Sequence, residues 1–139
     1  MTLVELVYTS EAASHVTSDD IHQLVEKARI KNRRHGLSGL LIHSAPYFIQ
    51  LIEGKAEAVI ETFNRVQEDA RHQNIHMLQL GLIDQRSFPE WDMGLIHAVG
   101  DWNLDNKQID RILRRPSRQV SKGILAIEHF YQQASVVPV

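Results

Sequence analysis

Three polar side chains stand within apolar segments of this sequence, and their types could do chemistry. Gln50 lies in the middle of the apolar run 47–54, and Tyr8 shares a strand face with Val4 and Leu6 in the run 3–10. Asn32 continues the apolar stripe of a helical pattern. A buried amide or phenol without a hydrogen-bond partner costs about 1–3 kcal/mol. We therefore expect Tyr8, Asn32 and Gln50 to gather around a bound group that is not protein.

The chemistry open to these groups is limited. A phenol can give a proton and an electron to a strong oxidant, and a carboxamide presents a donor and an acceptor that exchange places on rotation. Asn32 offers the donor and acceptor that an imide or lactam edge would match. None of the three is a strong general base, so the set suits holding a heterocycle. The alternative is three ordinary core polar groups, each satisfied by its neighbours.

The elements that position these residues follow from the periodicity of the chain. Capping residues at 17–20 begin a first helix that Gly36 ends, and a second helix follows Gly54. Two shorter helices are predicted over residues 104–115 and 121–133. The predicted strands span residues 3–10, 39–43, 47–53, 77–83 and 91–99.

This order predicts an α+β fold, a ferredoxin-like βαββαββ sandwich. We expect a five-stranded mixed sheet with two helices on one face and the C-terminal helix pair on the other. Residues 1–100 would form the ligand-binding domain, and residues 101–139 a helical extension that packs on the sheet.

Length and composition exclude several classes of protein. A chain of 139 residues suffices for one domain with a core, and the absence of cysteine excludes disulfides and thiolate metal sites. No apolar run approaches the roughly 20 residues of a membrane span, so a cytoplasmic protein is expected. The net charge of −2 does not indicate nucleic-acid binding. Residues 101–139 carry six basic and four acidic residues, a weak indication of an acidic partner.

Five ordered blocks of sequence are similar to those of the BLUF domain, a blue-light receptor that uses FAD. The resemblance covers roughly residues 2–99 and departs from the family at Leu37, Ser38 and Ala70, where the family commonly has Ile, Thr and Pro. The blocks are Tyr8-Thr9-Ser10, Asn32 with residues 36–41, residues 48–54, Asp69-Ala70-Arg71-His72 and residues 86–94.

The resemblance implies a photoreceptor without enzymatic turnover. FAD would lie non-covalently between the two helices, with Asn32 at its carbonyl edge and Gln50 between Tyr8 and the ring. Light would drive electron and proton transfer from Tyr8 to the flavin, and Gln50 would rotate or tautomerise. The remaining predicted cofactor-binding residues are Ser10, Leu24, Ala28, Arg29, Lys31, Arg65, Arg71, His72, Trp91 and Met93.

Several of these residues also have ordinary structural explanations. Arg29 and Lys31 suit a diphosphate, but the basic end of the first helix also complements the helix dipole. Trp91 and Met93 could be core residues of the last strand. His72 and His76 have the spacing of a zinc pair, but no third ligand is evident, so no metal site is expected.

Because no effector domain is evident, the signal would leave by contact with a separate protein. The resemblance implies a cyclic-dinucleotide enzyme or a transcription regulator as that partner, together with a homo-oligomer. The predicted output surface combines the C-terminal helices with the strand that carries Trp91 and Met93.

Two other functions fit the fold class. An acyl-phosphate hydrolase could use Asn32 and the arginines, but residues 11–15 form no anion-cradling glycine loop. An RNA-binding sheet would need an aromatic-rich strand motif that is missing here.

Overall fold

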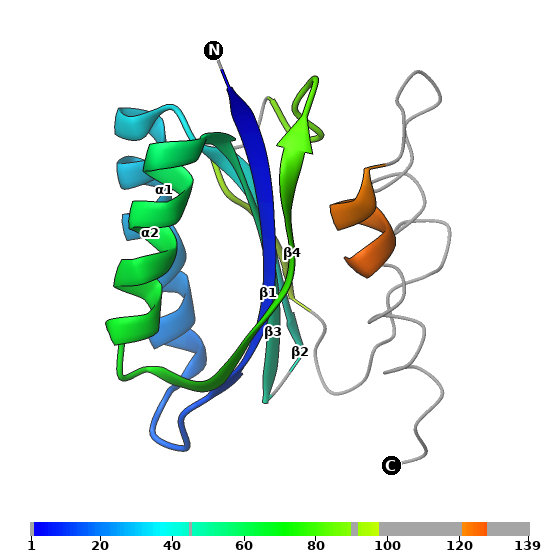
Figure 1. Ribbon diagram of the computed structural model, residues 1–139. Helices are drawn as coiled ribbons and strands as arrows, with labels where there is room; N and C mark the ends of the chain where they lie inside the picture. The colour runs from blue at the N-terminus through cyan, green and yellow to red at the C-terminus, as the bar shows by residue number, and fades with distance from the viewer. Residues whose placement is uncertain (1, 45, 90–91, 98–120, 128–139) are drawn as a thin grey trace.

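The computed structural model describes residues 2–44, 46–89, 92–97 and 121–127. Its elements are β1 (Leu3–Ala12), α1 (Ser18–His35), β2 (Ser38–Ser44), β3 (Tyr47–Lys55), α2 (Ala56–Glu68), β4 (His72–Ile83) and β5 (Gly94–His97). A short helix follows over residues 122–127. Figure 1 shows α1 and α2 on one face of the sheet and the helix 122–127 on the other.

The sheet has the order β4-β1-β3-β2-β5. Strand β1 pairs antiparallel with β3 and β4, β2 pairs antiparallel with β3, and β5 joins β2 in parallel. The α+β class predicted from the sequence is therefore confirmed. Of the predicted C-terminal helix pair, residues 104–115 and 128–133 lie outside the described residues.

Strands β1, β2 and β3 extend one or two residues beyond their predicted ends, and β4 and β5 differ from the prediction by more. Strand β4 begins at His72 rather than Met77, because the polar stretch 72–76 pairs with the end of β1 across a register shift. His72 and His76 therefore lie on a strand, not at a helix end. Strand β5 spans Gly94–His97, which leaves Met93 in the segment before it. Trp91 lies outside the described residues.

Local sequence explains where α1 begins and ends. Thr17 and Asp20 form a reciprocal capping box, with Thr17 N to Asp20 Oδ2 at 2.8 Å and Asp20 N to Thr17 Oγ1 at 3.2 Å. Gly36 ends the helix at φ 67°, a left-handed conformation that glycine adopts at little cost. These caps fix the ends of α1, and its apolar residues Ile21 and Val25 turn toward the sheet.

Removal of the capping box should destabilise the protein modestly. We expect Thr17→Ala to lower the free energy of unfolding by about 1 kcal/mol, because the amide of Asp20 loses its side-chain acceptor. Urea denaturation measures this difference, with Ser18→Ala as the control one residue further on. Equal midpoints for the two variants would contradict the role of the cap.

The helix-facing core is divided into two clusters. Under α2 lies one built from Val4, Leu6, Tyr8, Leu37, Ile52, Val59 and Phe63. Under α1 lies another built from Ile21, Val25, Leu41, Phe48 and Met93. Tyr8 belongs to the first cluster and Met93 to the second. The space between the clusters is where the candidate site lies.

Candidate functional site

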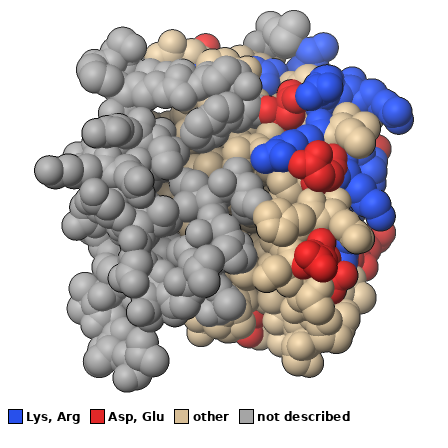
Figure 2. Space-filling model, turned by 180° about the vertical axis from the view of Figure 1, so that it is seen from behind, with Lys and Arg blue, Asp and Glu red and all other residues tan. Residues whose placement is uncertain are grey.

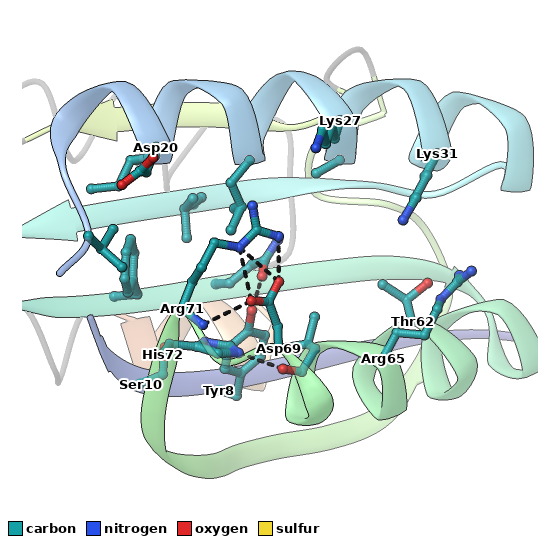
Figure 3. A pocket seen from close by; sticks show the side chains of 18 of the residues that line it. Tyr8, Ser10, Asp20, Lys27, Lys31, Thr62, Arg65, Asp69, Arg71 and His72 are labelled. Carbon is teal, nitrogen blue, oxygen red and sulfur yellow. Dashed lines mark hydrogen bonds and ion pairs between the residues drawn. The ribbon is translucent and has the colours of Figure 1, made fainter. Parts of the chain in front are cut away.

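A pocket of about 180 Å³ lies between α1 and α2, above β1 and β3 (Figure 3). Its walls are mainly apolar, and its polar groups come from both helices, both strands and the segment before β4. Ten predicted site residues line it: Tyr8, Ser10, Leu24, Ala28, Lys31, Asn32, Gln50, Arg65, Arg71 and His72. Residues not predicted for the site complete the lining: Val16, Asp20, Ile21, Lys27, Leu41, Phe48, Thr62, Val66 and Asp69.

Tyr8 and Gln50 meet at the floor of this pocket. They are directly opposite one another in the register of β1 and β3, and the Tyr8 hydroxyl donates to Oε1 of Gln50. The Tyr8 side chain is almost fully buried, with 4% of its surface exposed. Burial, and secondarily the charge of Asp69, raises the pKa of Tyr8 far above its usual value. The phenol is therefore a proton donor that does not ionise at neutral pH.

The second end of the Gln50 amide contacts Met93. Nε2 of Gln50 donates to Sδ of Met93 at 3.4 Å, and the Met93 side chain is buried. With Oε1 toward Tyr8 and Nε2 toward sulfur, each end of the amide has a partner suited to it. Rotation of the amide would exchange both partners at once.

The segment that carries Met93 is tied to α1 by three side chains on one side of the helix. Arg29 Nε donates to the Met93 carbonyl at 2.9 Å, and Asn32 Nδ2 donates to the Asp92 carbonyl at 2.6 Å. Arg33 Nε donates to Asp92 Oδ2 at 2.9 Å. Asn32 thus has a backbone partner that the sequence did not reveal. Arg29 is not among the pocket-lining residues, because its guanidinium contacts Met93 and Glu26.

Asp69 and Arg71 form an ion pair at the pocket, with Arg71 Nη2 2.5 Å from Asp69 Oδ2. The backbone amide of Arg71 also donates to Asp69 Oδ1 at 2.9 Å. The Arg71 hydrogen bonds lower the pKa of Asp69 to about 2, despite partial burial, which acts in the opposite direction. Asp69 is therefore anionic at neutral pH, and its charge contributes to the raised pKa of Tyr8.

The depressed pKa of Asp69 predicts how the free energy of unfolding depends on pH. A carboxylate whose pKa falls on folding stabilises the protein above its unfolded pKa, and that stability is lost as pH falls toward the folded pKa. Asp69→Asn should therefore lower the free energy of unfolding by about 2 kcal/mol at most near neutral pH. The difference from the parent protein should shrink as pH falls from about 4 toward 2.

Urea denaturation across this pH range measures the effect, and Asp84→Asn is the control because Asp84 is an exposed carboxylate away from the pocket. A difference that stays constant with pH would contradict the assignment of the stability to the Asp69 charge.

His72 joins Ser10 to the end of α2. Its Nδ1 lies 3.0 Å from Ser10 Oγ, and its Nε2 lies 2.5 Å from the Val66 carbonyl oxygen. A carbonyl only accepts, so Nε2 carries the proton, and in the neutral ring Nδ1 accepts from Ser10. The imidazole also stands edge-on to the Tyr8 ring, with centroids 6.3 Å apart. Ser10 and His72 therefore support the wall next to Tyr8.

Thr62 on α2 is a pocket residue that the sequence did not predict. Its Oγ1 is buried and has no hydrogen-bond partner among the described residues, although the residue lines the pocket. Unsatisfied buried hydroxyls are rare in folded proteins. A ligand in the pocket is the natural partner for this atom.

Cations gather at the end of the pocket near Thr62. Lys31 on α1 and Arg65 on α2 lie at this end in Figure 3, with Lys27 one turn away from Lys31. Figure 2 shows Lys and Arg side chains concentrated on the part of the surface that carries the helices. The arrangement can accept a ligand with a flat apolar body, polar edges and an anionic group.

The chain belongs to the BLUF family, described as sensors of blue-light using FAD, whose model matches residues 3–94. The predicted membership is confirmed, FAD is the cofactor of the family, and the hydrolase and RNA-binding alternatives are not favoured. Within the described residues, no helix is long and apolar enough to cross a membrane. No group of three or more His, Cys, Asp or Glu side chains in the described ranges could hold a metal ion.

Curated relatives are larger proteins. The chain is 28% identical over 93 residues to the photoactivated adenylate cyclase subunit beta of Euglena gracilis. The aligned part is 66% of this chain and 11% of that protein. It is 29% identical over 93 residues to the blue light- and temperature-regulated antirepressor BluF of Escherichia coli, covering 67% of this chain and 23% of the antirepressor. The chain thus spans about a tenth to a quarter of the length of these relatives.

Solved structures share the fold. BlrB, a BLUF protein in its dark state, aligns with a TM-score of 0.70 at 27% identity over 96% of both chains. Klebsiella pneumoniae BlrP1 with FMN and cyclic diGMP aligns with a TM-score of 0.79 at 26% identity, over 94% of this chain and 34% of that one.

Proposed function

We propose that this chain is a blue-light sensor that holds FAD without a covalent bond in the pocket between α1 and α2. The observation that carries the proposal is the hydrogen bond from Tyr8 to Gln50 at the pocket floor. A buried phenol and a rotatable amide, joined in this way, form a pair whose hydrogen bonds have two possible arrangements.

The residues of the pocket fit FAD. Apolar side chains that line the pocket, among them Leu24, Leu41 and Val66, would pack against the flat ring. Asn32 and Gln50 would reach its polar edge, and the orphan hydroxyl of Thr62 would gain a partner. Lys27, Lys31 and Arg65 would neutralise the diphosphate.

The residues of this chain suffice for a light-dependent rearrangement. Bound FAD would supply the absorption of blue light and, once excited, the electron-accepting power that no side chain here has. Tyr8 would give up an electron to that acceptor, and its phenolic proton would move along the existing hydrogen bond to Oε1 of Gln50. When the electron and proton return to Tyr8, the Gln50 amide is left rotated or tautomerised. Nε2 then no longer donates to Met93.

The altered contact at Met93 would bias the segment 92–93 and its ties to α1. We infer that this rearrangement, not turnover of a substrate, is the output of residues 1–100. Residues 101–139 would form the extension that packs on the sheet, and a separate effector, a cyclic-dinucleotide enzyme or a transcription regulator, would read the change. Self-association into a homo-oligomer belongs to the same proposal.

Absorption spectroscopy of the purified protein tests the proposal. The protein should be yellow or take up FAD on reconstitution, and blue light should shift its absorption reversibly to the red. Ala28→Trp should abolish flavin uptake by filling the pocket, whereas Ala70→Trp, at an exposed turn, should not. A folded protein that takes up no flavin would refute the proposal.

A further inference from the structure

Two buried carboxylates lie behind the Tyr8–Gln50 pair. In the register of β1 and β3, Tyr8 is opposite Gln50, and three residues along each strand Glu5 is opposite Glu53. Side chains alternate between the faces of a sheet, so this odd spacing places the two acids on the face away from the pocket. Their exposed fractions are only 2% and 0%. The same two strands therefore carry a polar pair on each face.

Glu53 holds the segment that leads toward Met93. It accepts from the backbone amides of Ser87 at 2.8 Å and Phe88 at 2.6 Å, and from the Ser38 hydroxyl at 3.0 Å. Burial nevertheless raises the pKa of Glu53, which these hydrogen bonds only partly offset. Among the described residues, Glu53 thus has three donors of its own, and none of them belongs to the helix 122–127.

Glu5 holds the start of the helix 122–127. It accepts from the Ser121 hydroxyl and from the Gly123 amide, each at 2.7 Å. The same hydroxyl accepts from the Ile124 amide at 3.1 Å, so Ser121 caps the helix while it donates to Glu5. The approach at Gly123 is close, because a Cβ there would lie 2.6 Å from a Glu5 oxygen.

This contact has an electrostatic cost that an apolar residue would avoid. Like charges directly opposite on neighbouring strands destabilise a sheet, and a buried carboxylate loses its hydration. Ile124 and Ile127 of the helix are buried, so apolar contacts hold the helix as well. What Glu5 adds is direction, because its two hydrogen bonds weaken steeply when their distance or angle changes with the position of β1.

We propose that Glu5 is the positioning residue that carries the light-driven rearrangement through the sheet to the helix 122–127. The inference rests on the proposed function and names the route of its output. Tyr8 and Glu5 are three residues apart on β1, about 10 Å along the strand. A shift of β1 when the Tyr8 hydrogen bond changes alters the two bonds of Glu5, which loosens the first turn of the helix on the far face (Figure 1).

Amide hydrogen exchange of the full, flavin-loaded chain tests this route. In the dark, Glu5→Leu should speed exchange at Gly123 by about tenfold or more, because the amide loses its side-chain acceptor. Glu5→Gln keeps one acceptor oxygen and should fall between Glu5→Leu and the parent. In the parent, illumination should speed exchange at Gly123. Glu5→Leu should remove this light effect while the red shift of absorption persists.

The matched control is Glu11→Leu. Glu11 is a carboxylate on the same strand, but its partner is Asn74 and not the helix 122–127. The variant should leave Gly123 exchange unchanged.

Gly123→Ala disturbs the contact from the helix side without touching β1, and it should also remove the light effect, whatever Glu5→Leu does to folding. A light effect on the exchange of the amide at position 123 that survives in Gly123→Ala, or in a folded Glu5→Leu, would overturn the route. A colourless chain would overturn the proposed function, and this inference with it, before any exchange is measured.

Discussion

Tyr8→Phe should bind FAD and remain yellow, yet show no red shift under blue light. The ring stays packed against Phe63, with which Tyr8 has a centroid distance of 5.4 Å, so the pocket keeps its shape. The variant loses the phenol that supplies the electron and the proton in the proposed mechanism. Gln50 loses the donor to its Oε1, which costs about 1–3 kcal/mol if that atom stays unpaired in the apo protein. Light-minus-dark absorption spectra and urea denaturation measure the two effects.

Tyr47→Phe is the matched control, because Tyr47 is exposed at the start of β3. It should switch normally and lose little stability. A normal photocycle in Tyr8→Phe would remove Tyr8 from the mechanism and transfer the donor role to another residue.

Gln50→Leu should also abolish the red shift, for a different reason. Leucine has a similar size, so the flavin should still bind, but no group remains that can exchange hydrogen bonds between Tyr8 and Met93. The buried Tyr8 hydroxyl loses its acceptor, which should lower the free energy of unfolding by about 1–3 kcal/mol. Electron transfer should still quench the flavin fluorescence, but the illuminated protein should show no red-shifted absorption.

Gln73→Leu replaces an exposed glutamine of β4 and serves as the control. The double variant Tyr8→Phe, Gln50→Leu should be more stable than the sum of the single effects predicts, since neither partner is left unpaired. Strictly additive losses, or a persistent red shift in Gln50→Leu, would show that the amide does not take part.

Much of the fold follows from local patterns. The capping box at Thr17 and the left-handed Gly36 bound α1 where the sequence predicts, because both act within a few residues. Strand β4 began earlier than predicted, because its first residues are polar and owe their extended form to pairing with β1. Pairing of that kind has no signal in the local alternation of the sequence.

The residues of the candidate site also differ in whether the sequence could predict them. Tyr8, Asn32 and Gln50 were identifiable because a polar group on an apolar face violates the pattern around it. Thr62 was not, because a threonine in an amphipathic helix violates nothing until its hydroxyl is found buried and unpartnered. Arg29 was predicted to bind phosphate by position, whereas its side chain contacts the Met93 carbonyl, a partner far away in the chain.

By itself, therefore, the sequence determined the class of fold, the family and the three polar residues of the pocket, since periodicity and side-chain type act locally. Only the tertiary structure decided the partners of those residues. Tyr8 lies opposite Gln50, and Glu5 opposite Glu53, because β1 and β3 pair in one particular register. A slip of one residue would send every side chain of a strand to the other face. Register is a property of the packed sheet, whose central strands β1 and β3 are buried on both faces.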